Sequence, residues 1–181
     1  AGGTGRRLWP LSLKSCPKPF IRFRGKESFF QRTLLRASGY KAPVISCNHA
    51  HYELVATQAV ATGQIPQQVF LEPEGRGTAA AIATVAHYLA GSNMGDAIFL
   101  ILPSDHLISQ KQAFHDAVQK ALPYVRRGDF VQIGVKAIRA DTGLGYIKQG
   151  SPVGDGAFTV DDFVEKPKAS DAASFIRDGG W

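Results

Sequence analysis

Cysteine is scarce in this 181-residue chain, and its two cysteines, Cys16 and Cys47, lack the spacing of a metal site. We therefore expect two reduced thiols, as in a cytoplasmic protein. Long apolar runs are also missing, because the longest, residues 97–102, falls far short of the ~20 residues that a membrane span requires. No signal-peptide pattern is present. These absences predict a protein without disulfides and without a membrane segment.

The net charge of +6 raises the question of a nucleic-acid partner. The basic residues cluster over residues 6–26 and are scattered afterwards, without the basic and aromatic interleaving of a strand-binding groove. A small ligand rich in phosphate explains such a cluster equally well. We expect no nucleic-acid partner.

Apolar runs alternate with stretches of helical periodicity over the first two thirds of the chain. This alternation predicts an α/β fold, a doubly wound, mostly parallel, Rossmann-like sheet with helices on both faces. The expected strands are 42–47, 68–73 and 96–106, and the expected helices are 49–62, 78–90 and 112–126.

The pattern changes after residue 128, where strand signals follow one another with a single short helix. We expect a single domain over 1–181, with a nucleotide-binding part over 1–128 and a smaller second-substrate part over 129–181. Strands are expected at 130–135, 143–150 and 158–167, and a helix at 170–177.

The opening segment AGGTGRR is glycine-rich. Gly2, Gly3 and Gly5 allow the backbone to turn tightly and its N–H groups to approach phosphate oxygens, while Arg7 and Lys18 can neutralise charge. No Gly-Lys-Ser/Thr follows, so it is not a Walker loop, and it lacks the third glycine of the dinucleotide fingerprint. A purely structural turn is the alternative, but the flanking cations favour a phosphate site.

Polar segments follow the other expected strands, at the sheet edge where doubly wound folds bind ligands. They read LEPEGRGT, PSDH, TGLGYI and VEKP. With the opening loop, these segments resemble, in the same order, five motifs of the sugar-nucleotide pyrophosphorylases. RLWPLS is similar to the mannose-1-phosphate guanylyltransferase branch. The sequence departs from the family pattern at Arg6, Gly77, Ala80 and Leu144, where Thr, Asn, Pro and Tyr are usual.

The resemblance implies transfer of GMP from GTP to mannose 1-phosphate, which yields GDP-mannose and pyrophosphate by a Mg²⁺-assisted in-line displacement. Arg7, Lys18 and Asp105 are the implied catalytic residues, and Asp105 is the implied Mg²⁺ ligand. The implied nucleotide-binding residues are Ala1, Gly2, Gly3, Gly5, Glu72, Arg76, Thr78, Ser104 and Asp105. The implied sugar-phosphate-binding residues are Gly145, Tyr146, Glu165 and Lys166.

Several assignments have a structural alternative, which for Glu165 and Lys166 is a solvated surface pair and for Gly145 and Tyr146 a plain hairpin turn. Asp105 has the residue type of a helix N-cap, and Glu72 that of a surface charge at a strand end. Arg76 and Thr78 fit the ordinary start of a helix. If Glu72 recognises the base, its carboxylate would accept hydrogen bonds from the two adjacent donors on the guanine edge. N1 of adenine is itself an acceptor, so the carboxylate could not bond to it.

Two further functions remain open from the sequence, namely a nucleotidyltransferase for glucose 1-phosphate and a non-catalytic, sugar-nucleotide-binding regulatory domain. A homo-oligomer is compatible with either. Because no strand precedes the glycine loop and further family motifs would follow GGW, we expect the domain to be incomplete at both ends.

Overall fold

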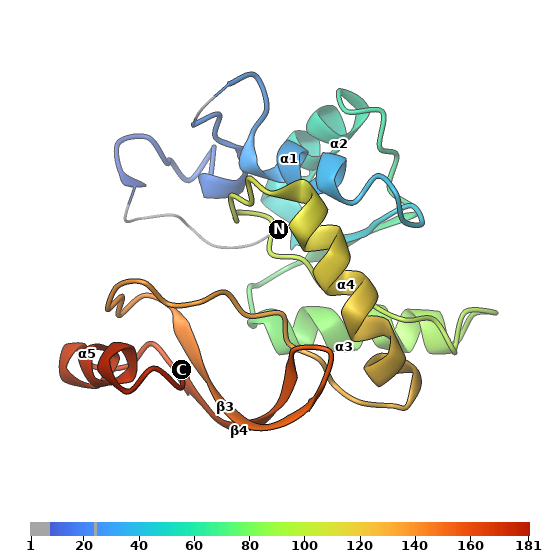
Figure 1. The fold of residues 1–181 in the computed structure, drawn as a ribbon. Coiled ribbons are helices and arrows are strands. Elements are labelled where there is room, and N and C mark those ends of the chain that lie inside the picture. Colours follow the sequence, from blue (N-terminus) through green and yellow to red (C-terminus); the bar gives the residue numbers. More distant parts are fainter. Residues whose placement is uncertain (1–7, 24) are drawn as a thin grey trace. The chain divides into compact units, whose positions relative to one another are not determined.

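The computed structural model describes residues 8–23 and 25–181, which form two compact units, Ala1–Lys111 and Gln112–Trp181. Figure 1 shows the course of the chain through each unit. The boundary falls earlier than the functional division expected after residue 128, which stays a prediction. The fold is mixed α/β with a parallel strand pair, as expected, whereas the doubly wound sheet with helices on both faces stays a prediction.

The first unit is built around two parallel strands, β1 (Val44–Asn48) and β2 (Gln68–Glu72), which pair in register from Val44 opposite Gln68 to Asn48 opposite Glu72. Between them runs α2 (Tyr52–Val60), after the 3₁₀ turn η3 (His49–His51), and α3 (Thr78–Ala90) follows β2. These elements confirm the predicted strands and helices of this region. The core consists of Phe20, Phe30, Leu34, Ile45, Cys47, Val55 and Ala59.

The short helix α1 (Phe29–Arg36) was not predicted from the sequence. It begins with a capping box, in which Ser28 Oγ accepts from Gln31 N at 3.1 Å and the Gln31 side chain accepts from Ser28 N at 3.0 Å. Phe30 and Leu34 project from α1 into the core. The Ser-x-x-Gln spacing before an apolar run is the signal that predicts this start.

Two predicted strands are wrong as elements of the described structure. Residues 96–106 and 130–135 run without regular secondary structure, although both are rich in β-forming residues. A strand is defined by its hydrogen-bonded neighbour, and within residues 8–23 and 25–181 no strand pairs with either segment. Their side chains are accordingly exposed, by 41% at Phe99 and 93% at Val135.

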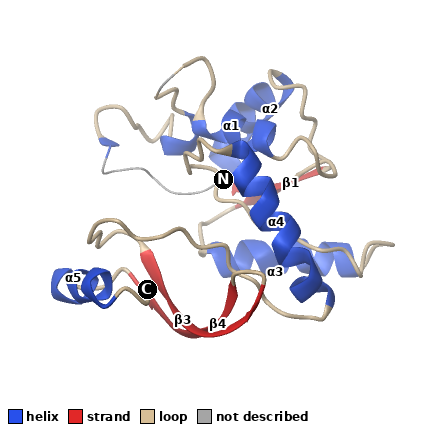
Figure 2. Ribbon diagram, in the orientation of Figure 1, coloured by secondary structure: helices blue, strands red, loops and turns tan. Residues whose placement is uncertain are grey.

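The second unit contains α4 (Lys111–Arg126) from its second residue on, the antiparallel strands β3 (Gly145–Gly154) and β4 (Ala157–Glu165), and α5 (Ala169–Asp178). The two strands form a long curved hairpin (Figure 2) with irregular register around Gln149 and Pro152. Gly145, at one end of β3, pairs with Glu165, at the end of β4. The hairpin therefore brings the TGLGYI and VEKP motifs together, and it confirms the strands and helix predicted over 143–177.

In the parts of the chain that the structure describes, no helix is both long enough and apolar enough to cross a membrane.

Candidate functional site

Lys18 is held at the start of η2 (Lys18–Phe20), between the buried residues Pro17 and Pro19. Phe20, which follows Pro19, is part of the core. Proline fixes φ, so the backbone that carries Lys18 has little freedom. The Lys18 side chain remains one third exposed. A rigid, anchored backbone thus presents a cation at the surface of the first unit.

The Lys18 ammonium donates to Asp105 Oδ2 at 3.1 Å, across 87 positions of sequence. Asp105 lies with Ser104 in a turn directly after the apolar run. The structure therefore brings two of the three predicted catalytic residues into contact. Both side chains are about one third exposed, so the pair contributes about 1 kcal/mol or less to stability. The pair places two opposite charges at the surface, where a charged ligand can reach them.

Asp105 supplies one carboxylate to a Mg²⁺ site, so the other ligands of the cation would be phosphate oxygens of the substrate and water molecules. Among the residues that the structure describes, no group of three or more His, Cys, Asp or Glu side chains could hold a metal. Mg²⁺ is often bound by one or two carboxylates together with substrate phosphates and several waters. A single carboxylate at the surface agrees with that mode of binding.

Glu72, the last residue of β2, accepts a hydrogen bond at Oε1 from the Ser46 hydroxyl of β1. Ser46 pairs with Phe70 and Asn48 pairs with Glu72, so Ser46 and Glu72 are diagonal neighbours on adjacent strands. The Glu72 carboxylate is half-buried and its orientation is fixed by this bond. Burial, and then the negative charge of Glu72, raise the pKa of the neighbouring Cys47 thiol, which therefore stays protonated at neutral pH.

The start of α3 differs from the alternative in which Thr78 caps the helix. Gly77, with φ of 84°, is the N-cap, Thr78 is the first helical residue, and no side chain accepts at the cap. Arg76 is exposed and forms a long 3.6 Å ion pair with Glu74. Helix N-termini of this kind offer free N–H groups to anions. The nucleotide-binding roles of Arg76 and Thr78 stay predictions.

In the second unit, Glu165 and Lys166 lie side by side at the end of β4, where Lys166 Nζ donates to Glu165 Oε1 at 2.6 Å. Both side chains are about half exposed. Gly145 lies opposite Glu165, and a Cβ atom at Gly145 would stand 2.8 Å from Glu165 Oε2 and 2.7 Å from the Phe163 ring. Glycine at position 145 therefore keeps the Glu165 carboxylate in its place.

Tyr146 is buried and its hydroxyl is already engaged. The hydroxyl accepts from Asp141 N at 2.8 Å and donates to the Arg139 carbonyl at 3.4 Å. The Asp141 carboxylate in turn accepts from Gly143 N at 2.9 Å. The Tyr146 ring packs against Phe175 of α5. In this structure Tyr146 supports the turn before β3, and its contact with a sugar remains a prediction.

The backbone of Lys166 adopts φ of 49°, although Lys166 is not glycine and precedes Pro167. Its N–H donates to the Leu144 carbonyl at 3.1 Å, which ties it to the start of β3. A side chain in the left-handed region costs about 1–2 kcal/mol per residue. Such strain is commonly retained where it places a functional side chain.

We expect Lys166→Gly to be more stable than Lys166→Ala by about 1 kcal/mol, because only glycine adopts this φ without cost. Urea denaturation of the two variants measures the difference. At Lys148, inside β3, the order should reverse, since glycine weakens a strand. The same order at both positions would contradict strain at Lys166.

Five predicted residues, Ala1, Gly2, Gly3, Gly5 and Arg7, lie outside the described residues, and their assignments stay predictions. Ser46 and Asp141, which orient Glu72 and the turn before Tyr146, were missed from the sequence. Asp141 carries a local signal, the Asx-turn spacing to Gly143. Ser46 carries none beyond the alternation of β1, because its partner is chosen by strand register.

Comparison with known proteins shows the family of this chain. The nucleotidyl transferase family model matches residues 1–181. The xanthan biosynthesis protein XanB of Xanthomonas campestris pv. campestris is 43% identical, and the mannose-1-phosphate guanylyltransferase RfbM of Salmonella typhimurium is 40% identical. Each match covers 100% of this chain and 38% of the relative, so the chain spans less than half of their length.

A solved structure supports the fold. The crystal structure of mannose-1-phosphate geranyltransferase from Thermus thermophilus superposes with a TM-score of 0.82 at 32% identity, covering 98% of this chain and 52% of that chain. The match extends over nearly all of the present chain, so the agreement is not limited to one motif. On the family model, the relatives and this superposition together, the chain belongs to the nucleotidyl transferase family.

Proposed function

We propose that this chain takes part in the transfer of GMP from GTP to mannose 1-phosphate, with GDP-mannose and pyrophosphate as products. The observation that carries the proposal is the 40% identity, along the whole chain, to a protein named mannose-1-phosphate guanylyltransferase. A phosphate oxygen of mannose 1-phosphate attacks the α-phosphorus of GTP, the new P–O bond forms, and the bond to the β-phosphate oxygen breaks. Pyrophosphate carries away the leaving electron pair.

The residues of the first unit act on the nucleotide in this proposal. Lys18, with Arg7 of the glycine-rich loop, neutralises charge on the phosphates that leave. The contact of Lys18 with Asp105 supports this assignment, because a cation and a carboxylate lie together at the surface. Glu72, oriented by Ser46, accepts from the guanine edge.

Asp105 is the side chain that would hold Mg²⁺. When bound, the cation supplies charge stabilisation to the phosphates during displacement. The Lys18 ammonium pairs with the same carboxylate. Ser104 lies in the same turn, and we assign it to nucleotide binding together with Asp105.

The residues of the second unit act on the sugar phosphate. Lys166 provides a point charge for the phosphate, and Glu165 accepts from sugar hydroxyls. Support comes from the strained backbone of Lys166 and from the space at Gly145 that fixes the Glu165 carboxylate. Tyr146 holds the loop that bears Gly145.

Release of pyrophosphate on mixing GTP, mannose 1-phosphate and Mg²⁺ with the complete polypeptide tests the proposal. Omission of mannose 1-phosphate should abolish release. Glucose 1-phosphate, tested with each of the other nucleoside triphosphates, should give slower release than mannose 1-phosphate with GTP. Faster release with glucose 1-phosphate would show that the acceptor is glucose 1-phosphate and not mannose 1-phosphate. Binding of GDP-mannose without any turnover would indicate a regulatory domain and contradict the proposal.

We expect Gly145→Ala to raise KM for mannose 1-phosphate about three- to tenfold and to leave KM for GTP within about twofold, an effect of roughly one hydrogen bond. The added Cβ displaces the Glu165 carboxylate and the Phe163 ring. Steady-state kinetics with each substrate varied provides the measurement. Gly180→Ala, where a Cβ meets no atom within 4 Å, is the matched control. Equal increases in both KM values would remove Gly145 from the sugar site.

A further inference from the structure

We propose that Phe29 is a positioning residue for Lys18, whose aromatic face fixes the direction of the ammonium group that meets the leaving phosphates. This inference rests on the proposed function for the role of Lys18. Phe29 carries no polar group and belongs to a helix that the sequence did not predict.

The first observation is that the Lys18 ammonium has two neighbours at once. Its Nζ atom lies 5.5 Å from the centroid of the Phe29 ring and 3.1 Å from Asp105 Oδ2. Cations are attracted to the negative face of an aromatic ring at this distance. An ammonium group has three N–H donors, and Asp105 takes one of them. With one third of the side chain exposed, the ammonium remains accessible to a further acceptor such as a phosphate oxygen.

The second observation is that the Phe29 ring is itself fixed. Phe29 is the first residue of α1, directly after the buried N-cap Ser28 and its capping box. Its N–H donates to the Ile21 carbonyl at 3.3 Å, and its ring stacks against Phe23 at 6.3 Å between centroids. Only 9% of Phe29 is exposed. A ring so constrained can define the position of a flexible lysine.

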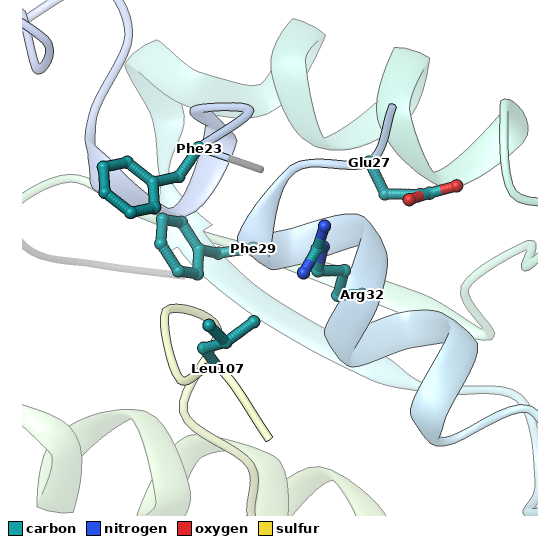
Figure 3. Close-up of a pocket in the computed structure, with 5 residues that line it drawn as sticks. All are labelled: Phe23, Glu27, Phe29, Arg32 and Leu107. Carbon is teal, nitrogen blue, oxygen red and sulfur yellow. The ribbon is translucent and has the colours of Figure 1, made fainter. Parts of the chain in front are cut away.

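The third observation concerns the segment that carries Asp105. Phe29 and Leu107, two positions after Asp105, line the same shallow surface pocket. Figure 3 shows the rings of Phe23 and Phe29 beside each other, with Leu107 close to Phe29. Phe29 therefore contacts the Lys18 ammonium through its ring face and shares a pocket with Leu107, which lies two positions after Asp105.

These contacts explain why a lysine with four rotatable bonds adopts one direction. An exposed ion pair alone is weak and leaves the ammonium several positions. The ring face adds an attraction that requires the ammonium to lie above it, so the ring and the carboxylate together define one position. A ligand phosphate then meets a preorganised cation.

The experiment measures binding of inorganic pyrophosphate by isothermal titration calorimetry in the complete polypeptide. Phe29→Leu should weaken binding about three- to tenfold, as expected for loss of a partly buried cation–π contact. Phe29→Tyr keeps the aromatic face and should stay within about twofold. Phe114→Leu is the matched control, because Phe114 is buried to the same degree as Phe29 and lies in the first turn of another helix, α4. It should leave pyrophosphate affinity unchanged.

A double-mutant cycle with Lys18→Met separates positioning from a structural effect. If Phe29 acts through Lys18, Phe29→Leu should have no further effect in the Lys18→Met background. The proposal would be overturned if Phe29→Leu weakened pyrophosphate binding equally with Lys18 and with Lys18→Met. It would also be overturned if Phe29→Tyr weakened binding as much as Phe29→Leu. A fluorinated phenylalanine at position 29 keeps the shape and weakens the negative ring face, so it gives the same test if Phe29→Leu does not fold. Normal pyrophosphate affinity in Lys18→Met alone would instead contradict the role of Lys18 in the proposed function.

Discussion

Asp105→Asn should lower kcat of the complete polypeptide by about 100-fold or more, while the affinity for GTP falls only a few-fold. Asparagine preserves the shape of the side chain but loses the negative charge that would hold Mg²⁺. The contribution of the cation to the displacement step is then lost, whereas contacts to the base and the phosphates remain. Turnover measured with saturating GTP and a separate GTP titration distinguish the two effects.

The same substitution removes the carboxylate that pairs with Lys18, so folding must be checked. Because the pair is about one third exposed, we expect a loss of about 1 kcal/mol or less in stability. Asp96→Asn is the matched control, since Asp96 is exposed and lies at the other end of the same apolar run. Near-normal turnover in Asp105→Asn would exclude the metal role, and titration with Mn²⁺ would show independently whether cation binding is weakened.

Glu72→Gln should lower kcat/KM for GTP by about one to two decades and relax discrimination against UTP and dTTP, because a charge-assisted hydrogen bond contributes about 1.5–3 kcal/mol. The Ser46 hydroxyl already donates to Glu72 Oε1. In the variant, the carbonyl of the introduced glutamine side chain can take that bond, which would turn the amide nitrogen, a donor, toward the guanine donors. The ratio of kcat/KM values for GTP and UTP provides the measurement.

Two neighbouring variants make this result specific. Glu74→Gln removes an exposed carboxylate two positions away and should change the ratio less than about twofold, since exposed ion pairs are weak. Ser46→Ala leaves the Glu72 charge but removes its fixed orientation, so we expect an intermediate loss. If Glu72→Gln keeps the parent preference for GTP, Glu72 does not read the base, and the backbone around residues 75–78 becomes the candidate.

Local patterns were enough to predict most elements of the described structure. The alternation of apolar runs predicted β1, β2 and α3 closely. After residue 128, strand signals predicted β3 and β4, and a short helical stretch predicted α5. In each case the deciding interactions are local in sequence or join neighbouring strands. The two wrong strands, at 96–106 and 130–135, show the limit, since β propensity does not provide a hydrogen-bonding partner.

The sequence by itself determined which residue types are present and in what order, namely the glycine-rich opening segment, the carboxylates of Glu72 and Asp105 and the Glu165–Lys166 motif. Residue types and their order are properties of the chain before it folds. Only the tertiary structure decided which of them meet. Lys18 reaches Asp105 across 87 positions, and Phe29, from a separate helix, lies beside the Lys18 ammonium. Strand register sets Ser46 against Glu72, and the hairpin fixes the strained backbone of Lys166. Such contacts depend on how distant segments pack, which is a property of the folded chain as a whole.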